Sequence, residues 1–354
     1  MKGRGVLIVL TLAALALGSE DWPPARTPAP LVGFSYSPLT SLEVGRDPAN
    51  DLAKLLDATH PDLVRLPIYW EFVQPAPDQL DFKSVDGLLA VVEKHNQTSP
   101  NMTRVVLTVG ARNFLFPELH QPPWAGPRTQ PYIGAMQAAL AYRTYFTTSI
   151  LRYRDSPLLF AWQVENEALD IVVNDFTGDD AIGVEQLKWE VDEVHRLDPR
   201  HQAVLTSYNA LNSTADLMQV YTPWLTPIIG GGSGHPGEAL ELGDAFGLDL
   251  YLDSPHVAWR SVVPIQLRSK WKQQTINFWA DRAHSQGKGM WLAEVQAQPW
   301  GDETSFAPGD LVSSAVDYRE ERLDVVLLWG VEAWLEDDAW LAAGQRAIQI
   351  LRAP

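Results

Sequence analysis

The 354-residue sequence predicts an α/β fold, a single (β/α)8 TIM barrel. From about residue 31, short apolar runs alternate with longer segments of helical periodicity, as in parallel strands covered by helices. Eight such runs occur along the chain, and eight strands are the number that closes a barrel of this kind. No repeat or low-complexity block interrupts the series.

The strands are predicted where short apolar runs are bounded by polar and turn-forming residues. In chain order they are Leu31–Tyr36, Leu63–Pro67, Val105–Val109, Leu158–Val164, Ala203–Ser207, Ala245–Tyr251, Met290–Glu294 and Val325–Trp329. Helices are predicted between them, most clearly over Val184–Leu197, where apolar residues recur every three or four positions before Pro199. Similar periodicity marks Val85–Val92 and Ala339–Leu351.

The N-terminus has the layout of a secretory signal peptide over residues 1–19. Lys2 and Arg4 precede an apolar stretch, Val6–Leu17, which is short for a membrane span and is followed by small residues. We therefore expect a secreted or extracytoplasmic protein, the alternative being an uncleaved N-terminal anchor. Residues 20–30 form a Pro-rich linker, and residues 31–354 form the barrel domain.

Composition limits the kinds of partner. The net charge of −17 disfavours nucleic acid and anionic lipid surfaces, so we expect neither as a partner. With no cysteine, the chain has no disulfide and no thiolate chemistry. Its 14 tryptophans, several of them just beyond predicted strand ends, favour a carbohydrate ligand, although most tryptophans pack a core.

Two predicted strands each deliver a glutamate at the end where such barrels keep their chemistry. The fourth strand runs into Trp-Gln-Val-Glu-Asn-Glu, which ends at Glu167, and the seventh ends at Glu294. Strands four and seven lie on opposite sides of a barrel, so the two carboxyl groups can face each other across its mouth. Cleavage of a glycosidic bond with retention requires two such groups about 5 Å apart.

These residues resemble the active site of the clan A retaining glycoside hydrolases. In that clan an Asn-Glu pair after strand four supplies the acid/base and a glutamate ending strand seven is the nucleophile. The resemblance implies that Glu167 is the acid/base, that Glu294 is the nucleophile, and that Asn166 binds the sugar 2-hydroxyl. It also assigns Arg65 and Tyr251 to the neighbourhood of Glu294, where they would keep it ionised, and Trp329 to the sugar-binding floor.

Two further residues are weaker candidates for substrate contact. Glu165 competes with Glu167, since regular strand alternation would put both on one side and Asn166 opposite. The clan distorts the chain locally after this strand, so Glu165 is expected to support the site or to contact substrate. Trp70, after the second strand, is a sugar contact or a packing residue. Trp124, Trp259, Trp300 and Trp334 are further candidates as sugar platforms.

The sequence thus predicts a retaining β-glycosidase that acts on oligo- or polysaccharides and requires no cofactor or metal. Two alternatives stay open. One is a catalytically inactive barrel that binds carbohydrate. The other is a transglycosylase that remodels a cell-surface glycan through the same covalent intermediate.

Overall fold

The fold is described by a computed structural model covering residues 29–115, 118–125, 136–169, 182–208, 236–253, 264–301 and 306–353. The predicted signal peptide and residues 20–28 of the predicted linker lie outside this description, so both stay predictions. Within the described ranges, no helix combines the length and the apolar character needed to cross a membrane.

Eight parallel strands form a closed barrel in sequence order, with β1 paired to β8. The strands are β1 (Leu31–Ser35), β2 (Leu63–Tyr69), β3 (Arg104–Gly110), β4 (Leu159–Val164), β5 (Gln202–Tyr208), β6 (Ala245–Leu250), β7 (Gly289–Gln296) and β8 (Val325–Trp329). All eight predicted strands are present, with ends that differ by at most two residues. The predicted fold class is therefore confirmed.

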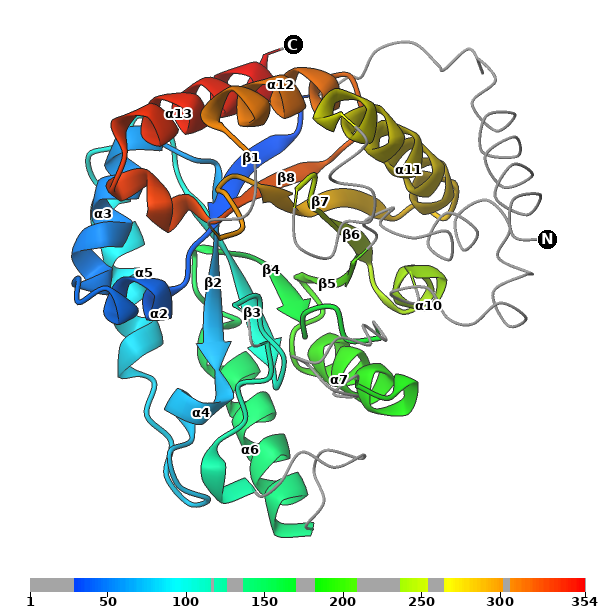
Figure 1. The fold of residues 1–354 in the computed structure, drawn as a ribbon. Coiled ribbons are helices and arrows are strands. Elements are labelled where there is room, and N and C mark those ends of the chain that lie inside the picture. Colours follow the sequence, from blue (N-terminus) through cyan, green and yellow to red (C-terminus); the bar gives the residue numbers. More distant parts are fainter. Residues whose placement is uncertain are drawn as a thin grey trace, which may run out of the picture.

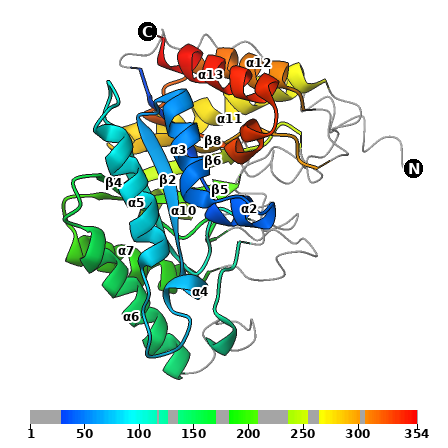
Figure 2. The same ribbon diagram turned by 90° about the vertical axis from the view of Figure 1, so that its left-hand side faces the viewer.

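Helices form a ring around the strands (Figures 1 and 2). They are α2 (Pro38–Glu43), α3 (Pro48–Thr59), α4 (Trp70–Val73), α5 (Lys83–Asn96), α6 (Met136–Tyr153), α7 (Val184–Leu197), α10 (Pro236–Leu242), α11 (Ile265–Ser285), α12 (Pro308–Arg319) and α13 (Asp338–Arg352), with 3-10 turns η1 (Pro123–Ala125) and η3 (Val331–Leu335). The three helices predicted from periodicity correspond to α7, α5 and α13. Asp47 and Asp337 cap α3 and α13 through their side chains.

Strand alternation divides the apolar residues into two layers. One layer fills the barrel interior with residues from neighbouring strands, among them Leu63, Val106 and Ala161. The other packs the outward side chains, such as Val105 and Leu107, against the helices. Inner-face positions nearer the C-terminal strand ends are polar, and these positions form the candidate site.

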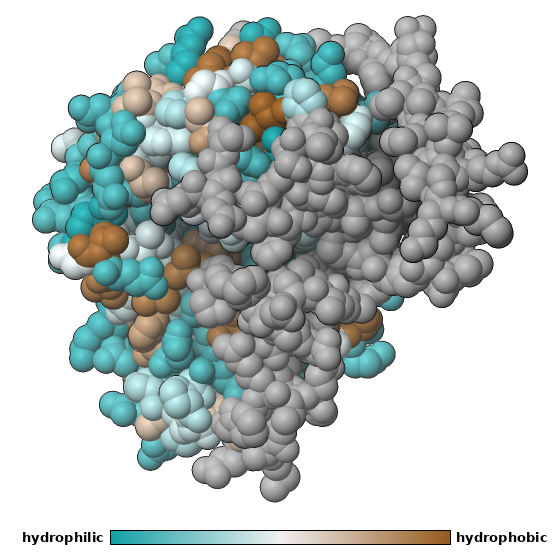
Figure 3. Space-filling view, in the orientation of Figure 1, coloured by the Kyte–Doolittle hydropathy of each residue, from teal (hydrophilic) through white to brown (hydrophobic). Residues whose placement is uncertain are grey.

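The outer surface shows hydrophobic residues as separate patches among hydrophilic ones on the described part of the face in Figure 3. The more exposed large hydrophobic residues are spread over several elements, for example Leu42 on α2, Leu140 on α6 and Val316 on α12. Isolated apolar residues of this kind are ordinary on a protein surface.

Candidate active site

A backbone irregularity in β7 turns Glu294 into the barrel. Trp291 packs in the interior layer, so strict alternation would point Ala293 inward and Glu294 outward. Instead, the register with β6 passes from Leu248–Leu292 to Asp249–Glu294, which leaves Ala293 as an extra residue. Such a bulge re-aims the side chains that follow it. Glu294 consequently shares the inner face with Trp291.

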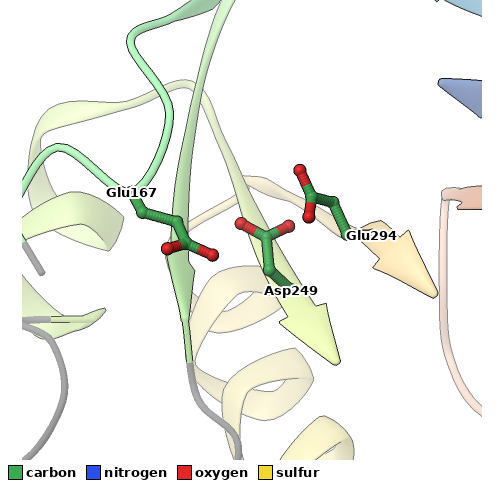
Figure 4. Close-up of side chains that lie close together, drawn as sticks. All are labelled: Glu167, Asp249 and Glu294. Carbon is green, nitrogen blue, oxygen red and sulfur yellow. The ribbon is translucent and has the colours of Figure 1, made fainter. Parts of the chain in front are cut away.

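A second irregularity follows β4 and separates its two glutamates. Glu165 and Glu167 both have left-handed backbones, with φ of 58° and 47°. This conformation is uncommon for residues other than glycine, and it concentrates at functional sites. The distorted segment sends the Glu165 side chain beneath the end of β3, while Glu167 faces Asp249 and Glu294 (Figure 4). The local distortion expected after this strand is present.

Arg65 and Tyr251 hold the Glu294 carboxylate from two sides. The Arg65 Nη2 atom donates to Glu294 Oε1 at 2.7 Å, and the Tyr251 hydroxyl donates to Glu294 Oε2. Arg65 also donates to Ser35 and Gln163, both at 2.8 Å, and its guanidinium lies 4.1 Å from the centre of the Phe114 ring. Three polar partners fix the orientation of this buried cation.

The charge state of Glu294 reflects two opposed effects. Burial raises the pKa of Glu294 above its usual 4.5, and Arg65 and Tyr251 pull it back by charge and hydrogen bonding. The net shift of the Glu294 pKa is upward. Arg65 and Tyr251 therefore reduce the free-energy cost of ionising this buried carboxyl group but do not remove it. Burial and the nearby carboxylates raise the pKa of Tyr251 well above 10, which keeps its hydroxyl protonated as a donor.

Asn166 lies buried between the two glutamates of its motif. Its Oδ1 accepts a hydrogen bond from Gln163 Nε2 at 2.8 Å, and the backbone N–H of Glu167 donates to Thr206 Oγ1 at 3.0 Å. The Asn166 Nδ2 group has no hydrogen-bond partner among the described residues. A buried donor left without a protein partner costs free energy unless a ligand or water accepts from it.

Three carboxyl groups gather at the C-terminal end of the barrel: Glu167, Asp249 and Glu294 (Figure 4). One oxygen from each lies within 4.8 Å of the others, and all three side chains are buried. This spacing suits either a shared divalent cation or a set of acid and base groups. The Arg65 guanidinium already supplies positive charge to Glu294, so the acid/base arrangement stands without a cation.

Glu165 lies behind the site in a network of its own. Its carboxylate accepts the backbone N–H groups of Ala111 and Arg112 at 2.9 and 2.5 Å, and the Tyr142 hydroxyl contacts both it and Glu190. One hydroxyl hydrogen cannot serve two carboxylates, so a second proton is needed. Burial raises the pKa of Glu190 well above 4.5, with repulsion from Glu165 adding to the effect, which supplies that proton.

The backbone around Glu165 depends on this arrangement. Gly110 has φ of 141°, and a Cβ added there would lie 2.3 Å from the Glu165 carboxyl carbon. Arg112 in turn donates from Nε to the Asn166 carbonyl at 2.9 Å. The position of Glu165 behind the site fits support of the site, one of its two expected roles, better than substrate contact.

Four aromatic rings line the site next to Glu294. The Trp329 and Trp300 rings are stacked with centres 5.0 Å apart, and Tyr251 meets both edge-on. Trp329 also donates from its indole to the Phe114 carbonyl, and Tyr208 completes the group. Two indole faces beside an acidic pair suit the C–H face of a sugar ring.

Trp70 does not belong to this group. Its side chain is fully buried, donates to Gln74 at 2.8 Å, and packs edge-on against Tyr142 and Trp124. Of the two interpretations open for Trp70, packing fits its position and a sugar contact does not. Trp334 is likewise buried, donating to the Ala297 carbonyl, and Trp259 lies outside the described residues.

Sequence reasoning did not single out three polar residues of the site: Gln163, Thr206 and Asp249. Gln163 links Arg65 to Asn166, and Thr206 accepts from the Glu167 backbone. Each follows an interior apolar residue of its own strand by an even number of positions, so it points into the barrel as well. Gln163 lies two positions after Ala161, Thr206 two after Val204, and Asp249 four after Ala245. Polar residues at inward positions near a C-terminal strand end were the signal that could have found them.

The structure resembles solved glycoside hydrolases. The GH5_18 enzyme of Streptomyces cattleya in complex with Manb1-4GlcNAc matches with a TM-score of 0.61 and 15% identity, over 85% of this chain and 71% of that one. A GH5_18 enzyme of Bifidobacterium longum gives 0.58 and 16%, over 85% and 68%. The β-galactosidase of Halorubrum lacusprofundi gives 0.56 and 14%, over 90% of this chain but 57% of the other.

Neither a protein-family model nor a curated protein matches the sequence. At these identities the structural likeness establishes the fold. The chain has the closed eight-stranded barrel of clan A glycoside hydrolases, as the sequence resemblance implied.

Proposed function

We propose that the protein is a retaining glycosidase that cleaves β-linked sugars by double displacement. One observation carries the proposal. Glu167 and Glu294 come from opposite sides of the barrel, and one oxygen of each lies within 4.8 Å of the other. Retaining enzymes place their two carboxyl groups about 5 to 5.5 Å apart, whereas inverting enzymes need room for a water molecule between theirs.

The first step transfers the Glu167 proton to the glycosidic oxygen while Glu294 attacks the anomeric carbon. The carbon–oxygen bond to the leaving group breaks, and its electron pair stays with the departing oxygen. In the second step water attacks the same carbon, gives its proton to Glu167, and releases Glu294 as a carboxylate. Arg65 and Tyr251 then receive the restored negative charge.

Asn166 is assigned to the sugar 2-hydroxyl because its buried Nδ2 donor is free of partners among the described residues. A contact there strengthens as the ring approaches an oxocarbenium-like transition state. Trp329 and Trp300 are assigned to the sugar face. The β-linkage follows the ligand named for the Streptomyces cattleya neighbour and the β-galactosidases among the other neighbours.

Aryl β-glycosides and β-linked polysaccharides, assayed with wild type, Glu167→Ala and Glu294→Ala, test the proposal. We expect Glu294→Ala to lose activity by at least about 10⁴-fold. Azide should restore turnover in that variant and yield a glycosyl azide of inverted configuration. Glu43→Ala, which changes an exposed glutamate, serves as the matched control.

Several outcomes would contradict the proposal. Unchanged hydrolysis in Glu294→Ala excludes this nucleophile. Sugar binding without hydrolysis by wild type points instead to a carbohydrate-binding barrel, and transfer of the glycosyl group to a sugar acceptor rather than to water identifies a transglycosylase.

We also propose that the protein is exported, on the basis of the basic start and short apolar stretch in residues 1–19. Mass spectrometry of the N-terminus of the protein recovered outside the cytoplasm tests this. Recovery of the full-length chain in the cytoplasmic fraction would contradict it.

A further inference from the structure

Asp249 is the third carboxyl group of the site, and neither step of the double displacement uses it. It lies on the inner face of β6, is fully buried, and is the register partner of both Tyr208 on β5 and Glu294 on β7. Figure 4 shows its carboxyl group between those of Glu167 and Glu294. Any function of Asp249 has to act on the charge balance of these two neighbours.

Most of the ionisable groups described around Asp249 are acidic. Glu167 faces it from the segment after β4, Glu294 faces it from β7, and Tyr251 directly follows its own strand, β6. Arg65 is a cation next to the cluster and is bonded directly to Glu294. Asp249 and Glu167 carry like charges at close range, so they repel each other whenever both are ionised.

The separation makes this repulsion large. Carboxylates with oxygens within 4.8 Å of each other in a buried site interact far more strongly than in water. Two like-charged groups of this kind lose their protons in two separated steps that belong to the pair. The charges of Asp249 and Glu167 are also among the causes that raise the pKa of Tyr251, so both carboxylates act electrostatically on this neighbouring group.

We propose that Asp249 is a positioning residue that keeps the catalytic proton on Glu167. The inference rests on the proposed function and assigns one proton to the Asp249–Glu167 pair at working pH. In the first step that proton goes to the glycosidic oxygen.

Asp249 matters equally in the second step. Once Glu294 is esterified its negative charge is gone, and the Arg65 cation is no longer neutralised. Glu167 would then be a weak base beside an uncompensated guanidinium. The Asp249 carboxylate persists through both steps and offsets this, so Glu167 can accept the proton from the attacking water.

The test compares pH profiles of kcat/KM for wild type, Asp249→Asn and Asp244→Asn. In Asp249→Asn the alkaline limb, which reports loss of the last proton from the pair, should move down by about 1 to 2 pH units. Asp244→Asn makes the same charge change at the opposite end of β6, next to its first residue Ala245, and should leave the limb in place. An unmoved limb in folded Asp249→Asn overturns the inference, including the case in which only KM rises.

A second measurement separates this inference from the proposed activity. Carboxyl ¹³C NMR of the free protein follows the Glu167 signal, assigned through its absence in Glu167→Gln. Its titration midpoint should fall in Asp249→Asn. If that variant does not fold, the reciprocal effect applies, and the Asp249 signal should titrate at lower pH in Glu167→Gln.

The two readouts fail independently. Wild type that cleaves no glycoside refutes the proposed function while the NMR titration still measures the pair. Independent titration of Asp249 and Glu167 refutes the inference even if the enzyme is active.

Discussion

Arg65 and Glu294 form a salt bridge of 2.7 Å with side-chain exposures of 0% and 2%. The two residues are 229 positions apart in the chain and come from β2 and β7. A buried pair of this kind contributes little net stability, but removing one partner leaves an uncompensated charge. The main effect of this salt bridge is therefore on the ionisation of the Glu294 carboxyl group and not on the stability of the fold.

Replacing Arg65 should damage activity through its effect on Glu294. Arg65→Met leaves the buried Glu294 without its cation and should lower kcat/KM by about 10² to 10³-fold. Arg65→Lys should recover only part of this loss, because one ammonium group cannot reproduce the bonds to Ser35, Gln163 and Glu294. Steady-state kinetics on an aryl glycoside measures both, and full activity in Arg65→Lys would count against the assigned role.

Tyr251→Phe should shift the acidic limb of the pH profile to higher pH. The hydroxyl of Tyr251 lowers the pKa of Glu294, so its loss leaves burial less opposed and raises that pKa further. The ionised nucleophile then forms only at higher pH, and kcat should fall about 10- to 100-fold at the wild-type optimum. An acidic limb that stays in place would show that the tyrosine does not act on the ionisation of Glu294.

Trp329 and Trp70 provide a matched pair of tryptophan substitutions. Trp329→Ala removes a ring of the stacked pair beside Glu294, and KM should rise by about tenfold. Trp70→Phe should leave KM unchanged but lower the free energy of unfolding by about 1 to 3 kcal/mol, because a core indole and its bond to Gln74 are lost. Kinetics and thermal melts of both variants check this. A raised KM in Trp70→Phe would indicate that Trp70 contacts the substrate.

Glu332, which follows β8 and accepts the Ser37 backbone N–H at 2.6 Å, should make stability fall with pH. Burial raises its pKa from 4.5 to about 7. The folded state thus holds a proton that the unfolded state releases, and the stabilisation present below pH 4.5 is lost as pH rises toward 7. Glu332→Gln should melt higher than wild type at pH 8 and no higher at pH 4. Exposed Glu93→Gln should show no such difference.

Glu190 should add a second pH-dependent contribution of the same sign. Its raised pKa means that stability declines as pH climbs above the ordinary glutamate range, when the proton shared with Glu165 and Tyr142 is lost. Glu190→Gln keeps a donor at this position and removes the titration. The melting temperature of the variant should therefore fall less than that of wild type between pH 5 and pH 8, and parallel curves would contradict the shared proton.

The sequence by itself determined the barrel and the positions of its two glutamates. Eight apolar runs with intervening helical periodicity were enough, because burial on both faces of a parallel sheet leaves a strong local pattern. The strand pattern did not assign Arg65, Tyr251 and Trp329; their expected places came from the resemblance to the clan A retaining glycoside hydrolases.

Only the tertiary structure decided which way the functional side chains point. Alternation alone would turn Glu294 outward and Glu165 inward, and the bulge at Ala293 and the left-handed backbone at Glu165 reverse both. The conformation at Glu165 is stabilised by the backbone N–H groups of Ala111 and Arg112, which lie more than 50 positions away and which no local pattern records. The meeting of Asp249 with Glu167 has the same origin, because barrel closure brings together residues that lie 82 positions apart.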